Sequence, residues 1–454
     1  MERTDKRYQT YVQILKEELV PAMGCTEPIA IAYAAAKARE VLGNMPDRVE
    51  IGVSDNIIKN VKSVIVPNTG GMKGIASAAA AGIAGGQADK QLEVISEVTA
   101  EQKKDMKLML EQVPFQVSAV DNGEIFDIII TLYHAEEMAK VRICQYHTNI
   151  SYIEKNGEVL FVNDEHDVKQ ACEQMVVKTG EKGYTEEEGG GQSGELVAEA
   201  GLSDKSLLNL KDILDFANTC DLEDVKPMLD VQIQYNTLIS EEGLLGDYGA
   251  NIGSTMLKTY GNDIKFRAVA KAAAGSDARM SGCELPVVIN SGSGNQGITV
   301  SVPVIEYAKE MWVSKEKMYR ALVVSNLIAI HQKAGIGRLS AYCGAVSAGC
   351  AAGCGIAYLH GGGYEELAHT LVNSLAIVSG IICDGAKPSC AAKIASSVQA
   401  GILGYHMYKN GQEFKAGDGI VTHGVEATIS NVGRLGREGM RQTDKEIVKM
   451  MMDE

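Results

Sequence analysis

The first third of the chain alternates between helical and strand spacing of its hydrophobic residues. Tyr11, Ile14, Leu15 and Leu19 fall on one face of a predicted helix over residues 8–20. Short runs rich in Ile, Val and Leu, bounded by Gly, Pro and Asn, instead predict strands. The pattern predicts further helices ending at Ala36 and over 102–112, strands over 48–54, 62–67, 126–132 and 139–143, and a hairpin turn at Asn156-Gly157.

The rest of the chain is expected to be almost wholly helical. Residues 186–194 form an acidic, Gly-rich run that is typical of a solvated linker, although a functional loop is the alternative. We therefore predict an α+β fold with two domains, an α/β unit over residues 1–185 and an almost all-helical unit over residues 195–454. Predicted helices in the second unit cover 203–219, 260–275, 303–312, 316–333, 340–359, 364–381, 390–408 and 440–452.

Length and charge narrow the class of protein. A chain of 454 residues is long enough for two cores. Its net charge of -16 argues against a nucleic-acid partner or an anionic membrane surface. No run reaches the roughly 20 apolar residues of a membrane span, and the charged N-terminus lacks a signal-peptide core. We expect a cytoplasmic protein that forms a homodimer and takes a small amino-acid substrate, with neither nucleic acid nor membrane as a partner.

Cysteines concentrate in two short segments, residues 342–354 and 382–390, which hold five of the ten. Cys350 and Cys354 lie in a Gly/Ala-rich helix and are interpreted as small core residues. The other three, Cys343, Cys383 and Cys390, fall at predicted helix ends or loops, where thiolates can converge. Spacing alone does not choose iron over zinc, nor does it establish that a metal binds at all.

Six segments carry distinctive motifs, at residues 24–28, 290–297, 342–354, 359–362, 382–390 and 431–440. Taken together, and over nearly the whole chain, these motifs resemble the iron–sulfur L-serine dehydratases and especially their L-cysteine desulfidase branch. The resemblance implies a dehydratase β-type domain in the N-terminal half and an α-type catalytic domain in the C-terminal half. It also implies a [4Fe-4S] cluster held by Cys343, Cys383 and Cys390, and Cys25 as the catalytic base.

The activity that this resemblance implies is β-elimination of L-cysteine to pyruvate, ammonia and hydrogen sulfide without pyridoxal phosphate. Cys25-Thr26-Glu27-Pro28 stands where the serine enzymes carry a Ser-Ser-His-like element, which favours cysteine over serine as substrate. Cys25 also falls at the predicted start of a helix, a place that lowers the pKa of a thiol and favours the thiolate.

Candidate substrate-binding residues lie in polar, Gly-rich turns and beside Cys25. Backbone N–H groups and short polar side chains in such turns can hold a carboxylate, whereas each turn has a purely structural alternative. Glu27 is a candidate for the substrate ammonium. The remaining candidates are Asn68, Thr69, Gly70, Lys73, Asn290, Ser291, Ser293, Asn295 and His423. The sequence assigns no role to His360, Cys283 or Arg434.

Two other functions stay open at this point. An L-serine dehydratase would use the same cluster with hydroxide as the leaving group. A non-catalytic metal or redox sensor would use the same cysteines to bind zinc or to cycle through disulfides. Iron content and a comparison of the two amino acids as substrates separate these alternatives.

Overall fold

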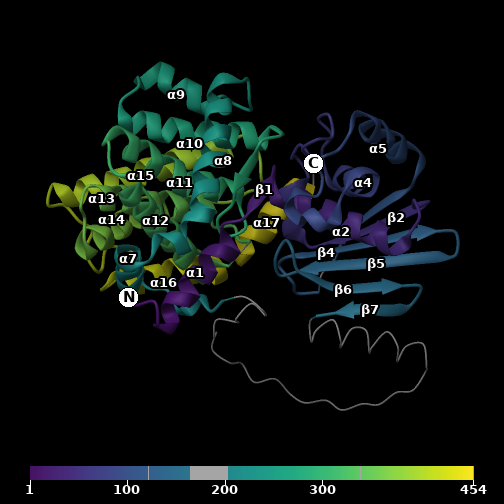
Figure 1. The fold of residues 1–454 in the computed structure, drawn as a ribbon, viewed down its shortest axis with the longest axis horizontal. Helices are drawn as coiled ribbons and strands as arrows, with labels where there is room; N and C mark the ends of the chain where they lie inside the picture. The colour runs from purple at the N-terminus through teal and green to yellow at the C-terminus, as the bar shows by residue number, and fades with distance from the viewer. Residues whose placement is uncertain (121, 164–202, 338, 453–454) are drawn as a thin grey trace, which may run out of the picture.

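The computed structural model describes residues 1–120, 122–163, 203–337 and 339–452, and it consists of a mixed sheet with helices beside a larger body of helices (Figure 1). Up to the end of the sheet the elements are α1 (Lys6–Glu18), β1 (Pro21–Met23), α2 (Thr26–Leu42), β2 (Arg48–Val53), α3 (Asp55–Val61), α4 (Ile75–Gly85), η1 (Ala88–Glu93), α5 (Ala100–Gln112), β3 (Phe115–Ala119), β4 (Asp127–His134), β5 (Glu137–Cys144), β6 (Ile150–Lys155) and β7 (Glu158–Val162).

The second part of the chain is helical apart from one short strand. Its elements are η2 (Lys205–Leu207), α7 (Leu210–Thr219), η3 (Leu222–Asp224), α8 (Lys226–Leu245), α9 (Ile252–Tyr260), α10 (Ile264–Met280), β8 (Pro286–Val288), α11 (Gly294–Glu310), α12 (Lys315–Ile336), α13 (Gly344–Leu359), α14 (Tyr364–Val378), α15 (Cys390–Lys409), α16 (Val425–Arg434), η4 (Leu435–Gly439) and α17 (Arg441–Met452). The predicted α+β class is confirmed.

The sheet has the strand order β3-β2-β4-β5-β6-β7, in which β2 and β3 are parallel and the other neighbours antiparallel. Alternation along β2 buries Val49, Ile51 and Val53, and α2 packs on this sheet over β4 and β5. One predicted strand is wrong. Residues 62–67 form only an isolated bridge between Ile65 and Lys73, because the turn that follows folds back at once.

The two parts of the chain are interlocked at several places. Strand β1 pairs antiparallel with β8, which joins the sheet half to the helical half. Helix α1 lies with the helical body, where Tyr8 and Tyr11 pack edge-on against Phe216 with ring centroids 5.2 and 5.4 Å apart. At the other end, α17 lies against α3, and Figure 1 shows the C-terminus beside the sheet half. The predicted linker and the boundary between residues 185 and 195 lie outside the described residues.

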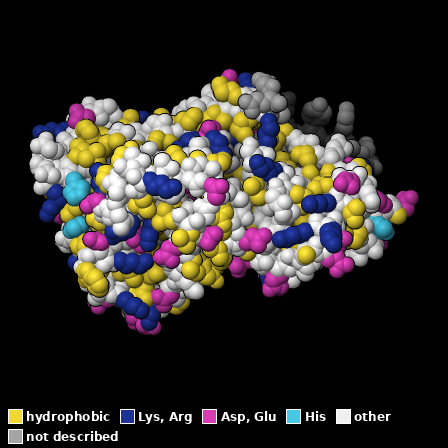
Figure 2. Space-filling model, turned by 90° about the horizontal axis from the view of Figure 1, so that it is seen from above, with side chains coloured by type: hydrophobic (Ala, Val, Ile, Leu, Met, Phe, Trp, Pro, Cys, Tyr) yellow, Lys and Arg dark blue, Asp and Glu magenta, His cyan; other side chains and the backbone are white. Residues whose placement is uncertain are grey.

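The surface carries charges of both signs. Figure 2 shows acidic and basic side chains interspersed over the visible face, so the described residues on that face form no continuous basic band. Among the described helices, none is both long enough and apolar enough to cross a bilayer.

Candidate active site

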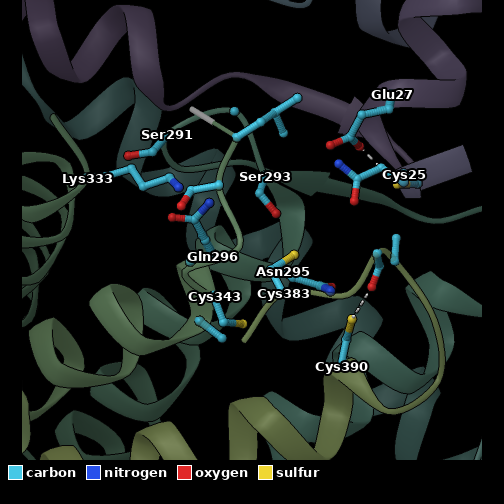
Figure 3. Close-up of a pocket in the computed structure, with 18 of the residues that line it drawn as sticks. Cys25, Glu27, Ser291, Ser293, Asn295, Gln296, Lys333, Cys343, Cys383 and Cys390 are labelled. Carbon is cyan, nitrogen blue, oxygen red and sulfur yellow. Dashed lines mark hydrogen bonds between the residues drawn. The ribbon is translucent and has the colours of Figure 1, made fainter. Parts of the chain in front are cut away.

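A cavity opens beside the β1–β8 pair, and its wall combines residues from both halves of the chain (Figure 3). The predicted site residues that line it are Cys25, Glu27, Ser291, Ser293, Asn295, Cys343, Cys383 and Cys390. Cys25 and Cys390 both line the cavity, so segments more than 300 residues apart in sequence meet there.

Helix N-termini converge on this cavity. Cys25 is the N-cap of α2, Ser293 the N-cap of α11 and Cys343 the N-cap of α13, while Cys390 is the first residue of α15. None of the three cap side chains forms a capping hydrogen bond. Unpaired N–H groups and the helix dipole make each of these ends partly positive, so the cavity favours an anionic occupant.

The cysteines at residues 343, 383 and 390 come from three separate segments and project toward the same part of the cavity in Figure 3. The Cys383 N–H donates to the Ala341 carbonyl oxygen at 2.6 Å, which fixes the two segments side by side. Burial and the nearby Cys383 raise the pKa of Cys343 to about 12. Burial likewise raises the pKa of Cys390. Without a cation these two thiols keep their protons at neutral pH.

Ion pairs fix the loop that carries Cys383. The Asp384 carboxylate pairs with Lys387 at 2.5 Å and also with Lys393 on α15. The Lys393 ammonium donates as well to the Ile382 carbonyl oxygen at 2.9 Å. The loop is thereby tied to the helix that begins at Cys390.

Among the described residues, no three His, Cys, Asp or Glu side chains are grouped to hold one metal ion. The thiols of Cys343, Cys383 and Cys390 are nevertheless soft donors of the kind that bind an anionic iron–sulfur cluster. Three soft donors beside partly positive helix ends suit such an anionic group.

Cys25 does not have the lowered pKa expected from its place at a helix start. The side chain is 2% exposed, and burial together with the Glu27 carboxylate raises the thiol pKa well above its usual value. The Arg279 guanidinium opposes this effect without cancelling it. Desolvation of the thiolate outweighs the helix dipole here. The Cys25 Sγ donates to Glu27 Oε2 at 3.1 Å, so a proton acceptor lies next to the thiol.

The predicted carboxylate loop at 290–297 is partly helical. Helix α11 begins at Gly294, earlier than the predicted start at residue 303. A Cβ on Gly297 would lie 1.9 Å from the Val288 carbonyl oxygen, so this residue lets α11 approach β8 closely. Asn290 is fully buried and donates to Asn326 Oδ1 at 2.9 Å. It stabilises the turn and does not line the cavity.

Five further candidates are not on the cavity wall: Asn68, Thr69, Gly70, Lys73 and His423. Asn68 donates to the Ile95 carbonyl oxygen at 2.9 Å, and Thr69 Oγ1 donates to the Val66 carbonyl oxygen at 2.6 Å. Both side chains thus stabilise the turn behind Cys25. Lys73 and His423 are exposed.

Residues without an assigned role lie away from the cavity wall. Cys283 is buried, His360 stacks on Tyr405 with ring centroids 5.2 Å apart, and Arg434 ends α16. Cys350 and Cys354 are fully buried, which confirms the interpretation of these two as core residues.

Sequence reasoning missed several residues of the wall, namely Asn60, His147, Arg279, Gln296, Lys333 and Tyr342. Arg279 had a recognisable signal. Residues 272–276 of α10 are all small, which indicates a closely packed part of the helix. A charged side chain three positions later is therefore a candidate for burial. Lys333 and Gln296 had none, because helical spacing does not reveal which end of a helix reaches a cavity.

Comparison with known proteins agrees with the resemblance seen in the sequence. The family model for the serine dehydratase alpha chain matches residues 89–449. A UPF0597 protein of Desulfitobacterium hafniense is 58% identical over 100% of this chain and 99% of its own length. UPF0597 proteins of Lachnoclostridium phytofermentans and Treponema denticola are 51% and 46% identical, each over 98% of this chain and over 100% and 98% of their own lengths. The chain therefore belongs to the serine dehydratase alpha-chain family.

Proposed function

We propose that this protein is an L-cysteine desulfidase that eliminates hydrogen sulfide from L-cysteine at a [4Fe-4S] cluster. The observation that carries the proposal is the cavity shared by Cys25 and by Cys343, Cys383 and Cys390, with helix N-termini around it. Membership of the serine dehydratase alpha-chain family supports a lyase.

Cys343, Cys383 and Cys390 would hold the cluster and leave one iron without a protein ligand. When bound, the cluster supplies a Lewis acid for the departing sulfide. The partly positive N-termini of α13 and α15 lower the cost of negative charge in this part of the cavity.

Cys25 and Glu27 would perform the proton chemistry. The Glu27 carboxylate accepts the proton of the Cys25 thiol, along the hydrogen bond of 3.1 Å that joins them. The Cys25 thiolate then takes the Cα proton of the substrate, and a raised thiol pKa makes it a strong base once it is ionised. The C–H electron pair forms the Cα–Cβ double bond while the Cβ–S bond breaks. Sulfide leaves with its electron pair, and water converts the aminoacrylate to pyruvate and ammonia.

The experiment is anaerobic reconstitution followed by assays of iron, acid-labile sulfide and product release from L-cysteine. We expect sulfide and pyruvate in equal amounts. Cys383→Ala should lose iron and activity together, whereas Cys350→Ala should lose neither, because Cys350 lies on α13 away from the cavity wall. Iron-loaded protein that releases no product from L-cysteine would refute the desulfidase proposal.

Variants of the proton-transfer pair separate chemistry from cluster binding. Cys25→Ala should keep the iron content and lower turnover by about 10²–10⁴-fold, the usual contribution of a general base. Glu27→Gln should also lower turnover, since it removes the acceptor for the thiol proton. Full turnover in both variants would exclude this pair from the reaction.

An L-serine dehydratase is the second candidate, because the matching family model is described by that activity. The same cavity and cysteines would serve, with hydroxide in place of sulfide as the leaving group. A higher kcat/KM for L-serine than for L-cysteine in the reconstituted protein would identify it as an L-serine dehydratase. A colourless protein that binds zinc and turns over neither amino acid would favour a metal or redox sensor.

A further inference from the structure

The cavity wall contains a buried cation, Arg279, for which the described residues supply no ion pair. Arg279, in the last turn of α10, is 2% exposed and lines the cavity. Its Nε and Nη2 atoms are buried and find no hydrogen-bond acceptor among the described residues. Arg142 is a contrasting case, since its Nε and Nη2 donate to the two oxygens of Asp127 at 2.8 and 3.0 Å.

Burial of a guanidinium without a hydrogen-bond acceptor destabilises the fold unless a bound ligand supplies the acceptor. Burial of a charge without a counter-charge lowers stability, and arginine is suited to bind a carboxylate through two parallel hydrogen bonds. The first residue of α11 also favours an anion here. A Cβ on Gly294 would lie 2.3 Å from Arg279 Nε, so the absence of a side chain keeps the guanidinium beside this helix N-terminus.

Hydrogen-bond acceptors complete the wall. Asn295 Oδ1 and Gln296 Oε1 are buried, line the same cavity and have no hydrogen-bond partner among the described residues. Carbonyl oxygens of this kind accept from an ammonium group. The guanidinium can donate to the carboxylate of a zwitterion, and the amide oxygens can accept from its ammonium group.

We propose that Arg279 anchors the α-carboxylate of the substrate and that the amide oxygens of Asn295 and Gln296 receive its ammonium group. This deepens the proposed function, on which it rests, by restricting the substrate to a free α-amino acid. Esters, amides and amines without a carboxylate would bind poorly.

Binding to the full-length protein tests the inference without turnover. The probes are L-alanine, which has no leaving group at Cβ, and L-alaninamide, which lacks the carboxylate charge. By calorimetry the unaltered protein should bind L-alanine about 10- to 100-fold more tightly, as hydrogen bonds to a charged group usually provide. Arg279→Met should abolish this preference, and Arg279→Lys should restore part of it.

Arg267→Met is the matched control. Arg267 also lies in α10, but it is half-buried and already pairs with the buried Glu306, and Glu306 keeps Lys271 at 2.9 Å when Arg267 is removed. The control should retain the preference for L-alanine. An unaltered protein without that preference, or an Arg279→Met variant that keeps it, would overturn the inference. Loss of the preference in Lys333→Met alone would assign the carboxylate to Lys333 and overturn it too.

Unfolding by urea provides a second readout. If the role of Arg279 is to bind a ligand, Arg279→Met removes an unpaired buried charge from the ligand-free protein. Without amino acid, this variant should therefore unfold at a higher urea concentration than the unaltered protein. An arginine with a purely structural role would give a lower midpoint, which would count against the inference. Failure of the desulfidase proposal is distinguishable, since sulfide release is measured separately and the preference for L-alanine does not depend on it.

Discussion

Helices α13 and α15 approach each other so closely that adding one methyl group at their crossing should push them apart. A Cβ on Gly401 of α15 would lie 2.2 Å from the Gly349 carbonyl oxygen of α13, whereas ordinary contact begins at 3.4 Å. The obstructing atom is backbone and cannot rotate away. Gly401→Ala should therefore push the helices about 1.2 Å apart at this crossing, the difference between those two distances.

The expected cost follows from two opposing effects. Overpacking of a core costs typically about 1–3 kcal/mol, and a clash with backbone belongs at the upper end of that range. Alanine gains about 1 kcal/mol over glycine in a helix interior. The net loss in the free energy of unfolding should be about 2 kcal/mol. Cys343 and Cys390 lie at the starts of these two helices, so under the proposed function the iron content after reconstitution should fall as well.

The assay is urea unfolding of the full chain, with iron content measured after anaerobic reconstitution. Gly335→Ala is the matched control, since a Cβ at this helical position meets only the Gly433 Cα, at 3.5 Å. We expect the control to unfold at the same midpoint as the unaltered protein or slightly higher. Equal midpoints for Gly401→Ala and Gly335→Ala would refute the claim that the crossing is too tight for a side chain.

Two further predictions concern buried ion pairs. Asp127→Asn should destabilise the sheet half by about 3–5 kcal/mol, because it breaks the buried ion pair between Asp127 and Arg142; an unchanged thermal midpoint would contradict this. Asp444→Asn removes the ion-pair partner of the buried Lys59 and should loosen α17 from α3. Limited proteolysis should then cut residues 441–452 faster than in the unaltered protein, and equal rates of cleavage would argue against it.

Local sequence pattern determined much of the secondary structure. The hydrophobic spacing of residues 8–20 and 102–112 predicted helices that the structure has at Lys6–Glu18 and Ala100–Gln112. The strand at 48–54 and the hairpin at Asn156-Gly157 are also confirmed. These elements depend on side-chain periodicity and turn chemistry within a few residues, which the sequence contains directly.

The same reasoning failed where distant contacts override local preference. Residues 62–67 have strand composition, but Val64 packs instead against Cys25 and Met280. Helix α11 extends back to Gly294 despite the Gly-rich character of this segment, because Gly297 allows close contact with β8. Neither contact is recognisable from neighbours in sequence.

For the site, the sequence by itself determined the chemical types and their place at helix ends. The sequence placed Cys343 near the start of a helix predicted over 340–359 and Cys390 at the start of another over 390–408. The structure begins the first of these at Gly344, with Cys343 as its N-cap, and the second at Cys390. Tertiary structure alone decided the protonation of Cys25 and the unpaired state of Arg279. Both depend on removal from water by segments hundreds of residues away, and desolvation energy is a property of the assembled core that no local pattern contains.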